Sequence, residues 1–520
     1  MRSSNTSSML CTVVVLASVA AAATASAQTI SPSGASRSSV QQLPLSGRQS
    51  TGGSVSTGQN AIGGGSNSSA NTVNTNVQVS GSYAGSVLDR SVTDGTLTLT
   101  LRDAIRRGLQ FNLGSISAKN TDSQVRAQRL LALSALLPAV DASFSFTEEK
   151  ESLKAEGLGA STIPSLGESL PSTIGPFHYY DARGTASQKI FDKTALDNYA
   201  SAKSLERASA LSQNDARELT TLAISSQYLR TLSDIALVQS QEAQVRYAQA
   251  SYDQAAAQNR AGTKARIDAQ RSLVELQTEQ QRLSSNRADL EKQELTLLRA
   301  MGVPLRIKIK LVETLPYHEV TNVSLDTAVQ AAEANRPDLK AAAQQLKAAE
   351  QALKASHSER LPTASASGYY GIEGINPNAG NGVFGVTGSV SIPIFDGRRI
   401  SADIAQASAT LSQRRAEYQD QEQNVELDVR NALIDLDVAS NQVKVAESNR
   451  KLALDTLKQS QDRFTEGVTD SVEVVQSAET LASAERDFIS SLYSHNVAKL
   501  SLARAMGELE KDAPGILEEK

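Results

Sequence analysis

The sequence predicts a mainly α-helical protein with a small β part, built from two copies of a helix–hairpin–long helix–helix repeat. Three observations predict this fold class. Marker sequences recur in the same order in the two halves of the chain. Segments with apolar residues at alternate positions, such as Phe384, Val386 and Val390, occur in both halves and are typical of strands. A run of about 66 residues without Pro or Gly follows in each half and indicates a very long helix.

Residues 1–27 are predicted to be a cleaved secretory signal peptide. Arg2 precedes a short apolar run, and Ala25-Ser26-Ala27 supplies the small residues of a cleavage site. The alternative is a retained membrane anchor, but the apolar run is shorter than a spanning helix needs. Cys11, the only cysteine, lies in the segment that would be removed, so we expect no disulfide in the mature chain.

Residues 28–97 are predicted to be a flexible, low-complexity tail. Ser, Gly, Asn, Thr and Gln dominate this segment, and large apolar residues are few. Gly63-Gly64-Gly65 has the glycines of a phosphate-binding loop, but no Gly-Lys-Ser/Thr follows. We therefore expect no nucleotide site there.

The two repeats are predicted to cover residues 98–304 and 320–509, with a linker at 305–319 and a C-terminal tail at 510–520. The pairs of marks are Ala104 and Ala328, Leu137-Pro138 and Leu361-Pro362, Ile190-Phe191-Asp192 and Ile394-Phe395-Asp396, Gly262 and Gly467, and Arg299-Ala300-Met301-Gly302 and Arg504-Ala505-Met506-Gly507. Their order is kept, and apart from a difference of one residue their spacing changes once, by 20 residues. A duplication with one enlarged loop explains this pattern.

Each repeat is expected to contain the same elements. A helix in two pieces runs to the Leu-Pro mark, and two strands joined by a loop end at the Phe-Asp mark. A long helix of about 100 Å then leads to Gly262 or Gly467, and a returning helix ends at the Arg-Ala-Met-Gly mark. The four strands of one chain cannot close a membrane barrel, which needs about eight or more. Several chains are therefore expected to share one barrel, continued by a helical tube.

The two junctions between strand and long helix are expected to be structural. At the second junction, Asp396 is expected to be a helix N-cap that accepts hydrogen bonds from backbone N–H groups of the first turn. We expect no chemistry at these positions. The residues concerned are Phe191, Asp192, Pro393, Phe395, Asp396 and Gly397.

Composition and motifs exclude several classes of function. A formal net charge of −5 gives no basic surface for nucleic acid. The four histidines are scattered, and no group of His, Cys, Asp and Glu has the spacing of metal ligands. No nucleophile motif is present either. The sequence therefore predicts no enzyme, no cofactor and no metal site.

Taken together, these marks resemble those of the TolC-like outer-membrane efflux proteins over about residues 98–509. Besides the duplication, the resemblance rests on Asn335-Arg336-Pro337-Asp338-Leu339, on Ser391-Ile392-Pro393-Ile394-Phe395-Asp396-Gly397, and on Arg463-Phe464-Thr465-Glu466-Gly467 leading to Glu473. It implies a trimeric, roughly 12-stranded β-barrel continued by a periplasmic α-helical tube. It also implies export with a periplasmic adaptor protein and an inner-membrane pump, and outer-membrane lipid around the barrel.

The resemblance assigns roles to the two helix turns. They correspond to the periplasmic tips that meet the adaptor, through Arg260, Gly262, Arg463 and Gly467. Glu473 corresponds to a carboxylate of the aperture ring, Asp470 lies beside it, and Gln476 stands where the family often has a second acid. Two features depart from the family's pattern. Lys189 stands at the first-half position that matches Pro393, and the Ser/Gly-rich tail is unusually long.

Opposite charges at the two turns predict a latch for the closed tube. The first turn, 260–271, carries four basic side chains against the acidic Asp268, and the second, 462–473, carries four acidic side chains against the basic Arg463. We expect Lys264 and Arg266 to face Asp470 and Glu473 across the hairpins.

The sequence therefore predicts a passive conduit in the cell outer membrane that extends into the periplasm. It would be the exit duct of a tripartite efflux pump or of a type I secretion system, driven by a partner. The alternative is a secreted coiled-coil structural or adhesive protein, which would not need two strand hairpins.

Overall fold

Two sets of strands and helices in the same order make up most of the chain. The computed structural model describes residues 53–61, 73–91, 95–153, 155, 172–263, 265–315, 317–318, 323–376, 378–466, 468–469 and 471–517. The first set is β3 (Thr96–Leu99), α2 (Leu101–Phe111), α3 (Leu113–Ser134), β4 (Ala139–Glu151), β5 (Ile174–Phe191), α4 (Lys193–Arg260) and α5 (Arg266–Ala300). The second set is β6 (Lys308–Leu311), α6 (Leu325–Asn335), α7 (Pro337–Ser358), β7 (Thr363–Gly374), β8 (Asn381–Ser391), α8 (Arg399–Thr465) and α9 (Ser471–Met506).

Several sequence-based predictions lie outside the described residues. They are the signal peptide 1–27, the tail up to residue 52, and the side chains or turns at Lys264, Gly467 and Asp470.

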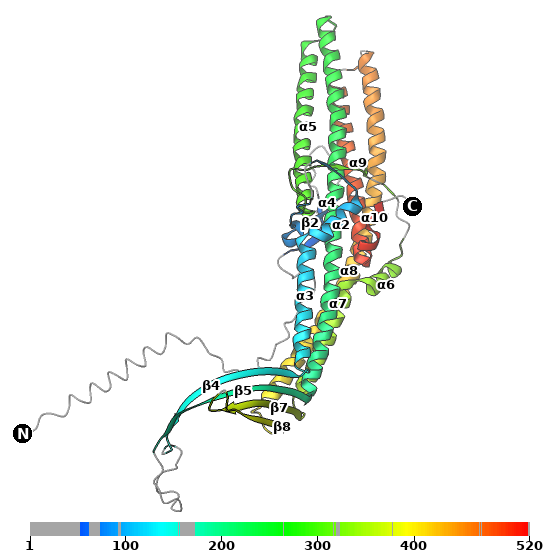
Figure 1. Cartoon of the computed structure of the whole chain (residues 1–520). Coiled ribbons are helices and arrows are strands. Elements are labelled where there is room, and N and C mark those ends of the chain that lie inside the picture. Colours follow the sequence, from blue (N-terminus) through cyan, green and yellow to red (C-terminus); the bar gives the residue numbers. More distant parts are fainter. Residues whose placement is uncertain are drawn as a thin grey trace, which may run out of the picture. The chain divides into compact units, whose positions relative to one another are not determined.

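The two long helices are the main structural elements. With 68 residues in α4 and 67 in α8, they match the predicted length, because no Pro or Gly interrupts either run. In Figure 1, α4 lies beside α5 and α7, and α8 lies beside α9. The sheet β4-β5-β7-β8 is at one end of these helices, and the α4–α5 and α8–α9 turns are at the other. The predicted mainly helical class is confirmed.

The helix that leads to each hairpin is broken once. Asn112 ends α2 and begins α3, and its side chain accepts a hydrogen bond from the Gly114 amide at 2.9 Å. The same side chain donates to the carbonyl oxygen of Tyr83 at 2.7 Å. In the second set Pro337 begins α7, where a helix needs no backbone N–H donor.

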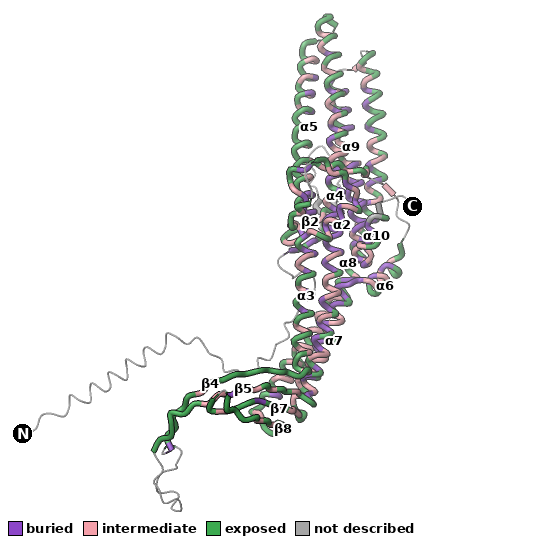
Figure 2. Tube along the Cα trace, viewed as in Figure 1, coloured by how far each residue is buried: buried purple, intermediate pink, exposed green. Residues whose placement is uncertain are grey.

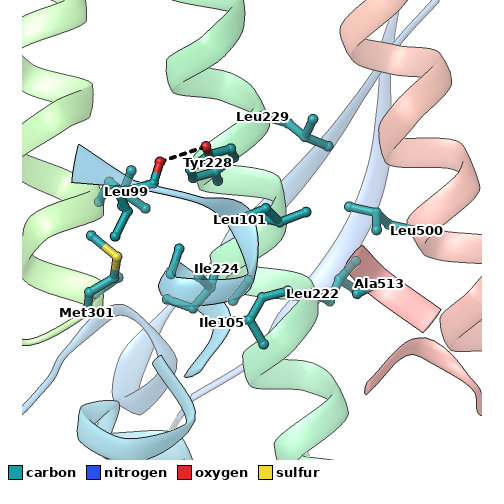
Figure 3. Packing of buried hydrophobic residues seen from close by; sticks show 14 of the residues in the cluster. Leu99, Leu101, Ile105, Leu222, Ile224, Tyr228, Leu229, Met301, Leu500 and Ala513 are labelled. Atoms are coloured by element: carbon teal, nitrogen blue, oxygen red, sulfur yellow. Dashed lines mark hydrogen bonds between the residues drawn. The ribbon is translucent and has the colours of Figure 1, made fainter. Parts of the chain in front are cut away.

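The largest hydrophobic core lies where α2, α4, α5 and α9 meet the short strands β3 and β6 (Figure 3). Leu99, Ile224, Tyr228, Leu229 and Met301 are fully buried there. The hydroxyl of Tyr228 donates to the carbonyl oxygen of Leu99 at 3.1 Å, so the one polar atom of this ring is satisfied. Figure 2 shows that burial is concentrated in this part of the helices and that the sheet is mostly exposed.

The predicted flexible tail 28–97 differs from the structure over the part that is described. Residues within it form β1 (Val55–Ala61), β2 (Val73–Val79) and the short helix η2 (Gly81–Ala84). β1 and β2 pair antiparallel, and Val55 and Tyr83 belong to the main core. The average composition concealed this, because a few valines and one tyrosine supply the apolar contacts in a segment that is otherwise polar.

The predicted linker and C-terminal tail also contain regular structure. β6 lies in the predicted linker and pairs in parallel with β3, which joins the two sets. Most of the predicted tail forms α10 (Leu509–Leu517), whose Leu509 and Ala513 are fully buried. Both segments are short, and tertiary contacts rather than local pattern decide their conformation.

Candidate functional site

The four-stranded sheet has two free edges. Its strand order is β4-β5-β7-β8, and every neighbouring pair is antiparallel. β5 and β7 are paired on both sides, whereas β4 and β8 each have one edge that no other described strand pairs with. An exposed edge presents backbone N–H and C=O groups that another strand can satisfy.

One face of this sheet is apolar and exposed. The register places Phe144, Ala182, Ile372 and Gly382 in one row across the strands, followed by the row of Ala142, Gly184, Tyr370 and Phe384. Phe384, Val386 and Val390 of β8 are 70–82% exposed. Water-exposed apolar surface on this scale indicates an interaction partner or a lipid environment.

The opposite face of the sheet is polar. It carries Ser143 and Ser145 of β4, Asp181, Arg183 and Thr185 of β5, Tyr369 and Glu373 of β7, and Thr387 and Ser389 of β8. An alternation of apolar and polar residues along each strand produces these two faces. Such a sheet separates an apolar environment from an aqueous one.

Aspartates bind backbone N–H groups at both strand–helix junctions, but the prediction of an N-cap at Asp396 is wrong, because the N-cap of α8 is Arg398. At the first junction, Asp192 is the N-cap of α4 and accepts from the Ala195 amide at 2.9 Å. The Lys189 ammonium group donates to the same carboxylate at 2.8 Å, and Phe191 beside it is half exposed.

At the second junction the chain is less regular. β8 ends at Ser391, so Pro393 and the highly exposed Phe395 lie outside the strand. Asp396 accepts from the amides of Arg398 at 3.1 Å and Ile400 at 2.7 Å. Gly397 has a φ of 64°, which suits glycine.

The α4–α5 turn is an exposed helix end. Gly262 has a φ of 73°, the left-handed conformation that commonly ends a helix. Arg260 is exposed, and its guanidinium lies over the last turn of α4, where Nε donates to the carbonyl oxygen of Ala256 at 3.4 Å. Arg266, the first residue of α5, is also exposed.

Glu473 lies in the first turn of α9 and is partly exposed. Its Oε1 is 3.3 Å from a guanidinium nitrogen of Arg463, and its other oxygen accepts a hydrogen bond from Thr469. These partners come from the same hairpin, α8–α9. Gln476, one turn later, is exposed.

The structure brings the two turns together at a contact that the sequence did not indicate. The Ser471 hydroxyl, at the start of α9, donates to Asp268 of α5 at 2.8 Å. Asp268 therefore joins the first hairpin to the second through a neutral partner. Lys264 and Asp470, the other residues of the predicted latch, lie outside the described residues.

Sequence reasoning also missed an acidic pair farther along α5. Glu275 and Glu279 line a cavity of about 20 Å³ between α4, α5 and α9. Burial, reinforced by the nearby Glu279 and Glu479, raises the pKa of Glu275 to about 7. Glu279 is buried and is bound by Gln241 and Arg282. Glu279 follows the buried Ser272 and Leu276 at the spacing of residues that share one buried face of a helix. This pattern in the sequence could have identified Glu279 as a core position.

A second missed feature is a buried group of charged residues between the two sets. Arg336 pairs with Asp338 at 2.6 Å and with Asp428 of α8 at 2.9 Å. Arg504 of α9 pairs with Asp215 and, at 3.2 Å, with Glu218 of α4. Burial raises the pKa of Glu218 to about 7 despite the nearby Arg504. The ion pairs of Arg504 connect α9 of the second set with α4 of the first, whereas those of Arg336 lie within the second set.

Two further observations concern the residues that the structure describes. No group of three or more His, Cys, Asp or Glu side chains there is arranged to hold a metal ion. Within the same residues, no helix combines the length and the apolar character needed to cross a membrane.

Comparisons with known proteins found a family match for one part of the chain. Residues 328–508, most of the second repeat, match the family of outer membrane efflux proteins. A comparison with curated proteins found no match. The resemblance expected from the sequence is therefore confirmed by the family match.

Solved structures with a similar fold cover most of the chain. A membrane protein from Pseudomonas aeruginosa is 18% identical with a TM-score of 0.67, and the match covers 82% of this chain and 92% of that one. The CmeC outer membrane channel of Campylobacter jejuni is 16% identical with a TM-score of 0.66, over 80% and 90% of the two chains. The open state of the MtrE outer membrane channel of Neisseria gonorrhoeae is 16% identical with a TM-score of 0.66, over 79% and 89%. At these identities the likeness concerns the fold.

Proposed function

We propose that this chain, whose residues 328–508 match the family of outer membrane efflux proteins, is the outer-membrane exit duct of an efflux system. The observation that carries the proposal is a sheet with one exposed apolar face and one polar face, whose strands lead directly into helices of 68 and 67 residues. Such a chain combines a surface suited to lipid with a long helical extension.

The sheet supports a barrel shared between chains. Its strands have 11 to 18 residues, and a tilted strand needs about 9–11 residues to cross a membrane. A lone four-stranded sheet leaves β4 and β8 with unpaired edges, which are costly in lipid. Pairing β8 of one chain with β4 of the next removes these edges, and three chains then give a barrel of about 12 strands.

Exposed apolar residues on α8 support the same assembly. Leu427, Ile434, Val438, Val445 and Leu452 are 37–62% exposed and follow one another at spacings of seven and four residues. This is the spacing of a coiled-coil seam, and nothing in the described part of the chain covers it. We infer that a neighbouring copy packs against this stripe in a homotrimer.

The helices would then form a tube in the periplasm. At 1.5 Å per residue, α4 extends for about 100 Å from the sheet. Its tip residues Arg260 and Gly262, with Arg463 and Gly467 of the second hairpin, would meet a periplasmic adaptor. Three copies of Glu473, with Asp470 and Gln476 beside them, would form a cation-attracting aperture.

The conduit itself would be passive. Its cargo would be moved by an inner-membrane pump joined to it by the adaptor, in a tripartite efflux pump or a type I secretion system. No enzyme activity is part of this proposal. The duct would lie in the cell outer membrane, surrounded by lipid, and extend into the periplasm.

The test is whether the chain forms a membrane oligomer through the stripe of exposed apolar residues on α8. Expressed in a bacterial host, the chain should fractionate with the outer membrane and run as a detergent-resistant oligomer on an unheated gel. Replacing Ile434 and Val445 with Asp should abolish the oligomer, because the seam would then bury unpaired charges. Lys444→Asp puts an aspartate on α8 beside the stripe and should leave the oligomer intact.

The alternative, a secreted coiled-coil structural or adhesive protein, predicts a different result. A soluble chain that runs as a monomer with or without heating would exclude the duct. An oligomer that survives the Ile434→Asp and Val445→Asp changes would place the contact between copies elsewhere.

A further inference from the structure

The two hairpins of the sheet repeat each other down to their strand register. The Leu-Pro marks match β4 to β7 at an offset of 224 residues, and the Phe-Asp marks match β5 to β8 at an offset of 204. These offsets carry the β4–β5 pair of Ala139 and Ser187 onto Thr363 and Ser391, which are paired in β7 and β8. The duplication therefore defines equivalent positions within the strands.

The contact between the two hairpins of one chain has a defined register. β5 pairs antiparallel with β7, so that Ser187 lies opposite Ser367 and Gly184 lies opposite Tyr370. β5 is the second strand of its hairpin, and β7 is the first strand of the next. A contact between β8 of one copy and β4 of the next copy would join the same two kinds of strand. The β5–β7 contact is therefore a template for the contact between copies.

The two offsets turn this template into one register for β8 and β4. The pair of serines becomes Ser391 opposite Ser143 of the next copy, and the glycine and the aromatic ring become Gly388 opposite Phe146. Hydroxyl groups then face each other on the polar side, and apolar groups face each other on the other side, which stabilises an antiparallel pair. The remaining partners on this stretch are Thr387 and Thr147, Ser389 and Ser145, and Val390 and Phe144.

Gly388 has the empty space that this register requires. In the described part of the chain, a Cβ at Gly388 would meet no atom within 4 Å. Its partner in the register, Phe146, is 52% exposed within one chain. A glycine at the edge of a sheet is stabilised when an aromatic ring from the adjoining strand packs over it. Phe146 of the next copy would provide that ring.

We propose that β8 of one copy binds β4 of the next in this single register, with Gly388 opposite Phe146 and Ser391 opposite Ser143. The proposal rests on the proposed function, because it concerns the contact through which copies share a barrel. The partner is a second copy of this chain. A slip by one residue would turn the apolar side chains to the polar face, and a slip by two would move Phe146 away from Gly388.

Disulfide cross-linking in the outer membrane tests the register. Ser391→Cys and Ser143→Cys are combined in a full chain whose only cysteine, Cys11, is changed to Ser. Directly opposite positions lie within reach of a disulfide, whereas positions displaced by two residues do not. On a denaturing, non-reducing gel, oxidation should therefore link copies about fivefold or more efficiently than it does for Ser391→Cys with Ser145→Cys or with Asp141→Cys.

Ser187→Cys with Ser367→Cys is the matched control for this cross-link. These two residues are the equivalent pair of the β5–β7 contact. Oxidation should join them within each chain, so the free thiols are lost while the covalent mass stays that of one copy.

Gly388→Leu tests the contact with Phe146 by a second route. The added side chain has room within its own chain but would collide with Phe146 of the next copy, so less of the detergent-resistant oligomer should remain on an unheated gel. Adding Phe146→Gly should restore the oligomer, because only one large side chain then occupies the contact. Gly382→Leu is the control, since it lies on the same strand and face but has no β4 residue opposite it in this register.

The experiments separate the register from the duct. If the oligomer forms but the pairs with Ser145 or Asp141 cross-link as well as the pair with Ser143, the register is wrong while the duct stands. The same holds if Gly388→Leu and Gly382→Leu affect the oligomer equally. If the wild type forms no oligomer in the outer membrane, the proposed function fails and this register with it.

Discussion

At the scale of single residues, Glu473 shows how the fold sets up a charge. It stands in the first turn of α9, where backbone N–H groups favour a carboxylate. Arg463 at 3.3 Å balances part of its charge from within the same hairpin. Three such carboxylates around one axis would still leave a constriction that attracts cations.

Replacing Glu473 with Gln should therefore lower cation preference and weaken block by multivalent cations in planar-bilayer recordings. Arg463→Gln should act in the opposite direction, because it removes the partner and keeps the acid. Glu447→Gln, on α8 and paired with Lys451, is the control for loss of an acidic side chain away from the turn. Unchanged selectivity in Glu473→Gln would remove this residue from the aperture.

Single residues also show which features the sequence can reveal. The contacts of Asp396 with first-turn amides were predictable, because they depend on neighbours within a few residues, but the N-cap itself is Arg398. The pairing of Asp181 with Glu373 was not predictable, because the two residues lie on different hairpins and only the strand register brings them together.

At the scale of elements, the acidic pair of α5 makes its packing sensitive to pH. Burial, then Glu279 and Glu479, raise the pKa of Glu275 to about 7 from an ordinary value of 4.5. The folded chain thus holds this proton more tightly than the unfolded chain does. Its stabilising effect is fully present below pH 4.5 and is lost as the pH rises through 7.

Glu275→Gln mimics the protonated form and should remove this dependence. At pH 8 the variant should exceed the wild type in free energy of unfolding by on the order of 1 kcal/mol, since solvent screens a half-exposed carboxylate. At pH 4, below the ordinary pKa of 4.5, the two should nearly agree. Denaturant unfolding of the detergent-solubilised chain, followed by circular dichroism, measures the difference. Glu291→Gln, an exposed position on the same helix, should show no such change between the two pH values.

Elements differ in how far their sequence determines them. The long helices and the two hairpins were predictable, because each carries its own period over many residues. β1, β6 and α10 were not, because each is short and is held by distant contacts: Val55 enters the main core, β6 pairs with β3, and Arg217 of α4 binds Glu510. In the sequence, Glu275 and Glu279 of α5 are recognisable only as polar residues within a row of positions that otherwise face the core.

At the scale of the whole molecule, the two sets of elements are tied together far from the tips. The parallel pair β3–β6 and the ion pairs of Arg504 with Asp215 and Glu218 fix the sets against each other in the middle of the helices. Beyond this level the helices α5 and α9 meet through few side chains, among them Asp268 and Ser471. The tips are therefore the part of the helices best able to move.

We expect charge complementarity between the two kinds of tip to hold the closed duct. The first turn is basic and the second acidic, and Arg266 is exposed where α5 begins. Each exposed pair is worth about 0–1 kcal/mol, so one pair would not decide the state of the duct. Repeated around a closed ring of three chains, several pairs can together favour the closed state by a few kcal/mol.

Reversing Lys264 and Arg266 to Glu should therefore raise the resting conductance in planar bilayers and the entry of antibiotics into cells. Lys292→Glu, an exposed position of α5 away from the turn, should change neither. Reversing Asp470 and Glu473 to Lys as well should partly restore closure, because opposite charges then face each other again with the signs exchanged. The latch is wrong if the double variant conducts no more than the wild type at rest, or if the quadruple variant does not lower the conductance again. In either case the charged side chains of these turns are merely solvated, and the contact of Asp268 with Ser471 is what joins the tips.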